Sequence, residues 1–228
     1  MSEVDIAAEE VVHADRTYSI EAEDLMVARI FYGALGRPRD YLGFYVDIGA
    51  FDPVEGSNTY HFYKRGWSGV NVEPNPKALK RFQAIRPRDV NLGAAIGPAG
   101  GSGKYFSFDD PMLNGLLDQD TIEWHIGHGC TVLGVDDVPF CSVENLLSKY
   151  VPAGVAIDYL NIDVEMMEHR ILSDWDFSRW RPTIIAVEIH GPLDILEIAL
   201  TPVATLLRRA GYTFISRLWH TSIFMLAG

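Results

Sequence analysis

From residue 41 onward, short apolar runs alternate with segments whose apolar residues recur every three or four positions. The runs are short and rich in β-branched residues, so we expect them to be buried strands. The recurring spacing predicts amphipathic helices between them. Proline follows a helix-capping residue at Asn75-Pro76 and Thr201-Pro202, which is typical of helix starts. The predicted strands cover residues 44–48, 68–73, 90–96, 157–162 and 183–189, with a terminal antiparallel hairpin at 212–216 and 222–226.

This alternation predicts an α/β domain over residues 41–228, with a mostly parallel sheet and helices on both faces. Residues 97–140 show no clear periodicity. Residues 1–40 precede the alternation, and apolar residues at helical spacing between 20 and 31 predict one helix there. We expect this N-terminal extension to pack on the domain as a cap, or to make a homodimer contact.

The composition narrows the class of protein. The 228 residues include 31 acidic and 19 basic side chains, for a formal net charge of −12. A chain with this negative charge is repelled by phosphate backbones and anionic lipids. We therefore expect neither a nucleic-acid nor a membrane partner. No apolar run approaches the roughly 20 residues of a membrane span. The acidic start lacks a secretory signal, and two cysteines make no disulfide framework, so we expect a cytoplasmic protein.

Acidic residues follow the first two predicted strands, where ligands bind in such sheets. Asp47 and Gly49 end the first strand, and Gly49 lets the backbone approach a ligand closely. Glu73 ends the second strand, and an acidic residue at about this separation accepts the hydroxyls of a ribose. Asp52 repels phosphate, which disfavours a dinucleotide and favours a cationic nucleoside such as S-adenosylmethionine. The alternative is that Asp47 caps a turn and Glu73 is simply solvated.

A second acidic group follows two later strands. Asp163 and Glu165 end the run 157–162, and Glu188 and His190 end the run 183–189. Carboxylates at two neighbouring strand ends suit a hard cation such as Mg²⁺, so we expect Asp163, Glu188 and Glu165 as metal ligands. His190 or Asp163 is then the candidate general base. Helix-capping acids beside a surface histidine are the alternative interpretation.

The motifs around these residues resemble those of the FkbM-type methyltransferases, which use S-adenosylmethionine. The resemblance covers residues 41–97 and 142–228 and departs from the family where Met166 and Met167 replace the usual glycine. Its motifs are Tyr45-Val46-Asp47-Ile48-Gly49-Ala50-Phe51-Asp52-Pro53, Ser57-Asn58-Thr59, Gly66-Trp67-Ser68-Gly69-Val70-Asn71-Val72-Glu73-Pro74-Asn75, Leu160-Asn161-Ile162-Asp163-Val164-Glu165, Trp175-Asp176-Phe177 and Arg181-Pro182.

The resemblance implies a Rossmann-like class I methyltransferase fold, with seven strands of which the last is antiparallel. It also implies O-methylation, most often of a sugar hydroxyl in a glycan or natural product. By matching position, Asp47, Gly49 and Ser57 are expected near the methionine part of the cofactor, Glu73 at the ribose and Asp109 near the adenine. Asp163 is expected beside the cofactor and, with Glu188, Glu165 and His190, to face the acceptor.

We therefore expect an S-adenosylmethionine-dependent O-methyltransferase that acts on a saccharide or glycosylated metabolite with help from Mg²⁺. Two alternatives stay open at this point. One is an O-methyltransferase for a phenol or polyketide, and the other is a sensor that binds the nucleoside without turnover.

Overall fold

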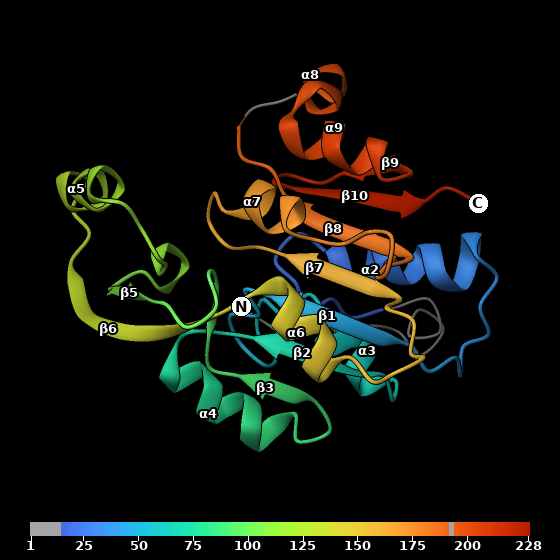
Figure 1. The fold of residues 1–228 in the computed structure, drawn as a ribbon, viewed down its shortest axis with the longest axis horizontal. Coiled ribbons are helices and arrows are strands. Elements are labelled where there is room, and N and C mark those ends of the chain that lie inside the picture. Colours follow the sequence, from blue (N-terminus) through green and yellow to red (C-terminus); the bar gives the residue numbers. More distant parts are fainter. Residues whose placement is uncertain (1–14, 192–193) are drawn as a thin grey trace, which may run out of the picture.

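Seven strands form the main sheet in the order β3-β2-β1-β7-β8-β10-β9 (Figure 1). The computed structural model describes residues 15–191 and 194–228. The strands are β1 (Phe44–Ile48), β2 (Ser68–Val72), β3 (Val90–Leu92), β7 (Tyr159–Ile162), β8 (Ile184–Glu188), β9 (Tyr212–Arg217) and β10 (Thr221–Leu226).

The pairing within this sheet confirms the predicted class I methyltransferase fold. Strand β1 pairs in parallel with β2 on one side and β7 on the other, and β7 pairs in parallel with β8. Strand β10 lies between β8 and β9 and is antiparallel to both, as the predicted terminal hairpin requires. The strand order reverses between β1 and β7, which is where open α/β sheets bind their ligands.

Helices cover both faces of the sheet because its strand residues alternate between two apolar cores. Val46 belongs to one core, against α6 (Val143–Tyr150), α7 (Glu168–Ser173) and α9 (Pro202–Arg209). Its neighbour Tyr45 belongs to the other core. There it packs with α2 (Glu23–Arg29), the π-helix η1 (Ile30–Ala34) and α3 (Tyr60–Lys64). The remaining helices are α4 (Pro76–Ile85), which contacts β3, α5 (Gln119–Gly127), α8 (Ile195–Leu200) and the 3₁₀ helix η2 (Pro111–Leu113).

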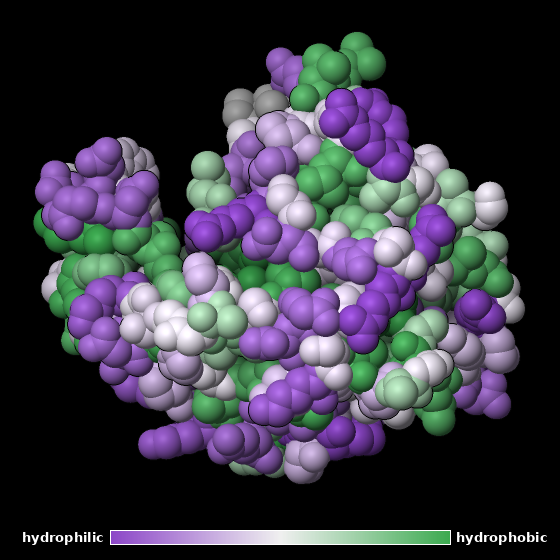
Figure 2. Space-filling view, in the orientation of Figure 1, coloured by the Kyte–Doolittle hydropathy of each residue, from purple (hydrophilic) through white to green (hydrophobic). Residues whose placement is uncertain are grey.

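A second, three-stranded sheet corrects one prediction. The expected continuous strand 90–96 is split into β3, which pairs with β2, and β4 (Ala95–Ile96), which pairs with β6 (Val132–Cys141). The chain turns at Gly93, where an added Cβ would lie 2.6 Å from the Leu79 side chain of α4. Strand β5 (Ser102–Phe108) pairs antiparallel with β6 to form an arm that ends in α5 (Figure 1). In the space-filling view, a hollow separates this arm from the side of the molecule that carries α8 and α9 (Figure 2).

The predicted N-terminal helix begins three residues later than expected. Helix α2 starts at Glu23 because Ala22 adopts a left-handed conformation, with φ of 65°. Helix α2 then continues into η1, whose residues Ile30 and Phe31 are buried against the sheet. The part of the predicted extension before residue 15 lies outside the described residues. Among the helices that the structure describes, none combines the length and hydrophobicity that crossing a membrane requires.

Candidate cofactor and acceptor site

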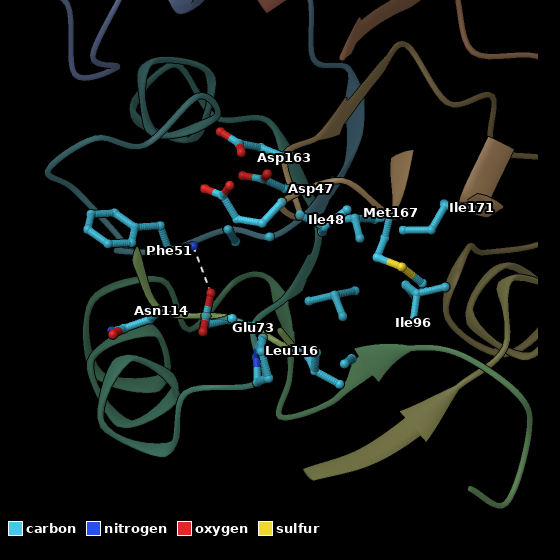
Figure 3. Close-up of a pocket in the computed structure, with 18 of the residues that line it drawn as sticks. Asp47, Ile48, Phe51, Glu73, Ile96, Asn114, Leu116, Asp163, Met167 and Ile171 are labelled. Atoms are coloured by element: carbon cyan, nitrogen blue, oxygen red, sulfur yellow. Dashed lines mark hydrogen bonds between the residues drawn. The ribbon is translucent and has the colours of Figure 1, made fainter. Parts of the chain in front are cut away.

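A cavity of about 290 Å³ opens beyond the carboxyl ends of β1, β2 and β7, at the point where the strand order reverses. Asp47 and Asp163 line it next to each other, and Glu73 lines it at a separate position (Figure 3). Ile96, Met167 and Ile171 lie together at an apolar end of the cavity, while Ile48 lies near Asp47 and Leu116 near Glu73 (Figure 3). One end of the cavity therefore suits cationic and hydroxyl groups, while the other suits a flat apolar ring.

Asp47 is buried at the end of β1 and held by two neutral donors. The Thr59 hydroxyl donates to Oδ2 at 2.6 Å, and Asn161 Nδ2 donates to Oδ1 at 3.0 Å. Burial raises the pKa of Asp47, while the Thr59 hydrogen bond and the charge of Arg86 oppose that rise. The Asp47 carboxylate is thus oriented toward the cavity by its partners and can bind a cationic group there.

Behind Asp47 lies an arginine with no exposed surface. Arg86 pairs with Asp89 at 2.8 Å and donates to the hydroxyls of Thr59 at 2.9 Å and Ser57 at 3.2 Å. Asp89 also accepts from the backbone N–H of Gly69 at 3.0 Å. The pair is therefore held by further hydrogen bonds, which a buried charge requires.

Glu73 ends β2 and is almost fully buried. Its carboxylate accepts a hydrogen bond from the backbone N–H group of Phe51 at 2.9 Å (Figure 3) and another from that of Asn75 at 2.7 Å. Burial raises its pKa to about 7. The carboxylate is held in the lining of the cavity, where it can accept hydrogen bonds from a pair of hydroxyl groups.

Gly49 brings the ends of β1 and β7 into contact. It has φ of +82°, and an added Cβ would lie 1.7 Å from the backbone oxygen of Asp163. No other residue fits here without moving one strand end away from the other. Gly49 is therefore required by the close approach of the Asp163 backbone, whereas its expected approach to a ligand stays a prediction.

A second cluster lies at the ends of β7 and β8. The Nε2 atom of His190 is 3.0 Å from Glu188 and 3.5 Å from Glu165. Hydrogen bonding to Glu165 and Glu188 raises the pKa of His190 to about 10. Burial tends to raise the pKa of Glu188, but His190 holds it below its ordinary value. Burial and the charge of Glu188 raise the pKa of Asp163 well above its usual range, so the two neighbouring carboxyl groups have opposite tendencies to hold a proton.

The backbone is strained where the sequence departs from the FkbM pattern. Glu165 and Met166 both have positive φ, 54° and 76°, although neither is glycine. Such conformations cost on the order of 1 kcal/mol each and persist only where surrounding contacts hold them. The turn directs Glu165 to His190, while Met166 is exposed and Met167 lines the cavity.

The structure brings together most of the residues singled out in the sequence, though not all in one cavity. Asp47, Gly49, Glu73, Asp163 and Glu165 line the cavity. Glu188 and His190 adjoin it through Asp163 and Glu165. Ser57 lies behind the lining, where its hydroxyl accepts from Tyr60 N–H and from Arg86. Asp109 lies outside the lining, on the surface, and accepts from Thr131 N–H at 2.9 Å.

Sequence reasoning missed three groups at this site. No role is predicted above for Asn161, although a polar residue inside the apolar run 157–162 indicates a buried hydrogen-bonding partner. Arg86 carried no such signal, because an arginine at a helix end is usually solvated. The segment 97–140 also contributes, since Tyr105, Leu116 and Phe140 line the cavity.

The sequence matches the methyltransferase FkbM domain over residues 47–214. Similar solved structures include the FkbM methyltransferase from Methylobacillus flagellatus (16% identity, TM-score 0.45), where the alignment covers 95% of this chain and 50% of that one. They also include the O-methyltransferase from Bacillus cereus in complex with SAH (11% identity, TM-score 0.45), where the alignment covers 96% of this chain and 90% of that one. A third is the Burkholderia thailandensis 1,6-didemethyltoxoflavin-N1-methyltransferase (14% identity, TM-score 0.43), where the alignment covers 91% of this chain and 80% of that one. No curated protein matches the sequence.

Proposed function

The chain belongs to the FkbM methyltransferase family, and from this premise we propose that it transfers a methyl group from S-adenosylmethionine to a hydroxyl group of a saccharide or glycosylated metabolite. One observation carries the proposal. The cavity at the reversal of strand order combines two buried acidic side chains, Asp47 and Glu73, with an apolar end. The charge and polarity of that arrangement match a cationic nucleoside.

Each part of the cofactor has a complementary group in the cavity. The ammonium group pairs with Asp47, whose charge is held in place by Thr59 and Asn161. The ribose hydroxyls donate to Glu73, which then stays ionised. The adenine ring packs among the apolar side chains around Ile96 and Met167. The sulfonium then lies near Asp163, and its methyl group points to the second cluster.

The acceptor is placed at the cluster of Glu165, Glu188 and His190. Carboxylates and a histidine offer several hydrogen bonds to hydroxyl groups. The exposed ring of Trp219 lies 6.0 Å from the ring of His220, which in turn lies 6.0 Å from the ring of His190. An exposed indole beside hydrogen-bonding side chains gives a sugar ring both a stacking surface and polar partners.

In the proposed reaction, the acceptor oxygen attacks the methyl carbon in line with the sulfur. The carbon–sulfur bond breaks, and its electron pair stays on the sulfur of S-adenosylhomocysteine. The hydroxyl proton passes to an ionised carboxylate of the cluster, for which Glu188 is the best placed. His190 and Asp163 are the bases expected from the sequence, but the raised pKa of each group favours its protonated form. Positioning of the two reactants supplies much of the rate enhancement, and proton transfer about 10²- to 10⁴-fold more.

The same cluster has the donor set for a divalent cation. Glu165, Glu188 and His190 offer ligand atoms that lie within 4.8 Å of one another. Carboxylate oxygens suit Mg²⁺, so Glu165, Glu188 and Asp163 are the residues that would hold it. When bound, the ion would act as a Lewis acid on the acceptor oxygen. Chelation followed by Mg²⁺ titration tests this part by itself.

The experiment for the proposed function measures transfer of a labelled methyl group from S-adenosylmethionine to a panel of saccharides and phenols. We expect label in a saccharide product that resists mild base, as a methyl ether does and a methyl ester does not. Label only in phenols would favour the small-molecule alternative. Tight binding of S-adenosylhomocysteine with no transfer to any acceptor would favour a sensor.

A further inference from the structure

Two apolar side chains from separate segments stand exposed at the mouth of the cavity. Ile20 is 62% exposed and Met112 is 48% exposed. Both line the cavity described above and also an adjoining cavity of about 490 Å³, which shares Glu73 with it. Exposed apolar groups at the rim of a polar-ended cavity are groups that a bound ligand would cover. Ile20 lies outside residues 47–214, which match the family domain.

The segment Thr17–Glu23, which carries Ile20, is anchored to the domain on one side by Tyr18. The ring of Tyr18 packs edge-on against Tyr60 of α3, with centroids 4.9 Å apart. Its hydroxyl accepts a hydrogen bond from Lys64 Nζ at 2.8 Å. Tyr18 thus attaches the segment to the helix that directly follows Thr59.

On the other side, Glu21 attaches the segment to the turn between β9 and β10. Its carboxylate accepts from the backbone N–H groups of His220 at 2.9 Å and Thr221 at 3.3 Å. His220 Nδ1 lies 3.0 Å from the same carboxylate. Ile20 therefore lies between an anchor on α3 and an anchor on the last hairpin of the sheet.

The segment is also braced internally. Asp24 has no exposed surface and accepts hydrogen bonds from Tyr18 N–H at 2.7 Å, Thr17 Oγ1 at 2.7 Å and Ser19 Oγ at 3.0 Å. The position of Ile20 is consequently defined before any ligand arrives. Little conformational entropy is therefore lost in ordering this segment when a ligand binds, which favours affinity.

Ile20 lies over the loop that holds Glu73. Its Cδ1 atom is 3.6 Å from where a Cβ on Gly56 would stand, and Phe51, whose N–H donates to Glu73, lines both cavities beside it. Glu73 and Ile20 line the same two cavities, so a ligand bound to Glu73 in either of them has Ile20 in the wall of its site.

We propose that the segment Thr17–Glu23 belongs to the cofactor-binding site, with Ile20 covering the ribose of bound S-adenosylmethionine and Glu21 fixing the segment to the β9–β10 turn. The proposal rests on the proposed function for the identity of the cofactor. It adds a binding element that lies outside the matched family domain. Covering the ribose excludes water from its hydrogen bonds with Glu73 and buries the Ile20 side chain, and both effects favour the bound state.

The test is calorimetric titration of the full-length protein with S-adenosylhomocysteine, using Ile20→Ala, Ile20→Leu, Glu21→Gln and Leu42→Ala. Leu42 is 66% exposed, like Ile20, but lies before β1, at the end of the strand remote from the cavity. We expect Ile20→Ala to weaken binding about 10-fold, because it removes apolar contacts to the ligand. Ile20→Leu should bind with the wild-type affinity to within about twofold, since leucine has the same number of carbon atoms as isoleucine. Glu21→Gln should weaken binding several-fold, and Leu42→Ala should not change it.

Thermal unfolding without ligand separates binding from stability. Ile20→Ala should unfold at the same temperature as Leu42→Ala, but should gain less stability from S-adenosylhomocysteine. If the wild type binds and Ile20→Ala binds equally well, the inference about this segment is wrong while the proposed cofactor stands. If the wild type does not bind S-adenosylhomocysteine at all, the proposed cofactor is wrong and this inference fails with it.

Discussion

The hydroxyl of Thr59 donates a hydrogen bond of 2.6 Å to the buried carboxylate of Asp47. The same hydroxyl accepts from the Arg86 guanidinium at 2.9 Å, so it links a buried cation to a buried anion that faces the cavity. Arg86 is in turn paired with Asp89. The charge of Asp47 in the cavity thus depends on the buried residues Thr59, Arg86 and Asp89.

Thr59→Val should weaken the binding of S-adenosylhomocysteine about tenfold. Valine keeps the volume of threonine but removes the donor to Asp47, and a hydrogen bond to a charged group is worth about 1.5–3 kcal/mol. Without that donor the pKa of Asp47 rises further and less of its charge remains for the ligand ammonium. Calorimetry measures the change, and Thr59→Ser, which keeps the hydroxyl, is the control. Equal affinities for the two variants would contradict the argument.

Binding of S-adenosylhomocysteine should strengthen as the pH rises from 6 to 8. Burial raises the pKa of Glu73 to about 7, so the unliganded carboxyl group is mostly protonated at pH 6 and mostly ionised at pH 8. Only the ionised form accepts from both ribose hydroxyls, so the affinity should rise roughly tenfold over this range. Glu73→Gln should bind more weakly and lose most of this pH dependence.

The same raised pKa predicts how the stability of the unliganded protein varies with pH. The folded state binds a proton at Glu73 more tightly than the unfolded state does, so folding loses stability as the pH rises from about 4.5 through 7. Glu73→Gln removes the titrating carboxyl group and with it this loss of stability at higher pH. Urea unfolding at pH 5 and pH 8 should therefore show that the variant gains stability relative to the wild type at the higher pH. A constant difference between the two proteins would argue against a shifted Glu73.

Glu188→Gln should lower kcat by about 10²- to 10⁴-fold while leaving the affinity for S-adenosylhomocysteine close to that of the wild type. This follows if Glu188 accepts the acceptor's proton and does not touch the cofactor. His190→Gln should have a smaller effect, because His190 carries a proton at neutral pH and acts as the charged partner of Glu188. If His190→Gln is as inactive as Glu188→Gln, and its rate no longer varies with pH, His190 is the base after all.

Met166→Gly should stabilise the protein by up to about 1 kcal/mol, because glycine adopts positive φ without strain. The Met166 side chain is 74% exposed, so little packing is lost. Met166→Ala is the matched control, since it removes the same side chain but keeps the strain. Urea unfolding should place Met166→Gly above both the wild type and Met166→Ala. Equal stabilities of the two variants would mean that the turn carries no strain at this residue.

Much of the main sheet could be predicted from local sequence. The run 44–48 is apolar and β-branched, and it forms β1 with the predicted bounds. Asn75 caps α4 by accepting from Lys77 N–H, as its place before a proline indicated. The acidic residues at the ends of β1, β2 and β7 reach one cavity because parallel strands end at the same edge.

What could not be predicted depends on pairing between distant residues. Residues 90–96 look like one strand, yet Ala95 pairs with Phe140, which lies 45 positions later. Arg86 ends an amphipathic helix and is fully buried only because Asp89 and Tyr45 meet it there. Ile20 precedes its helix and reaches the cavity through contacts made by its neighbours Tyr18 and Glu21.

Because the chain leaves the main sheet after β3, the cavity is lined by residues from two separate sheets. One wall belongs to the seven-stranded sheet, and the other belongs to the β5–β6 hairpin, which pairs with β4 in a separate sheet. Residues can be inserted or deleted between β5 and β6 without shifting the register of any strand in the main ladder. Since Tyr105, Leu116 and Phe140 from this part of the chain line the cavity, changes in the arm can alter the apolar end of the cavity while Asp47 and Glu73 keep their positions.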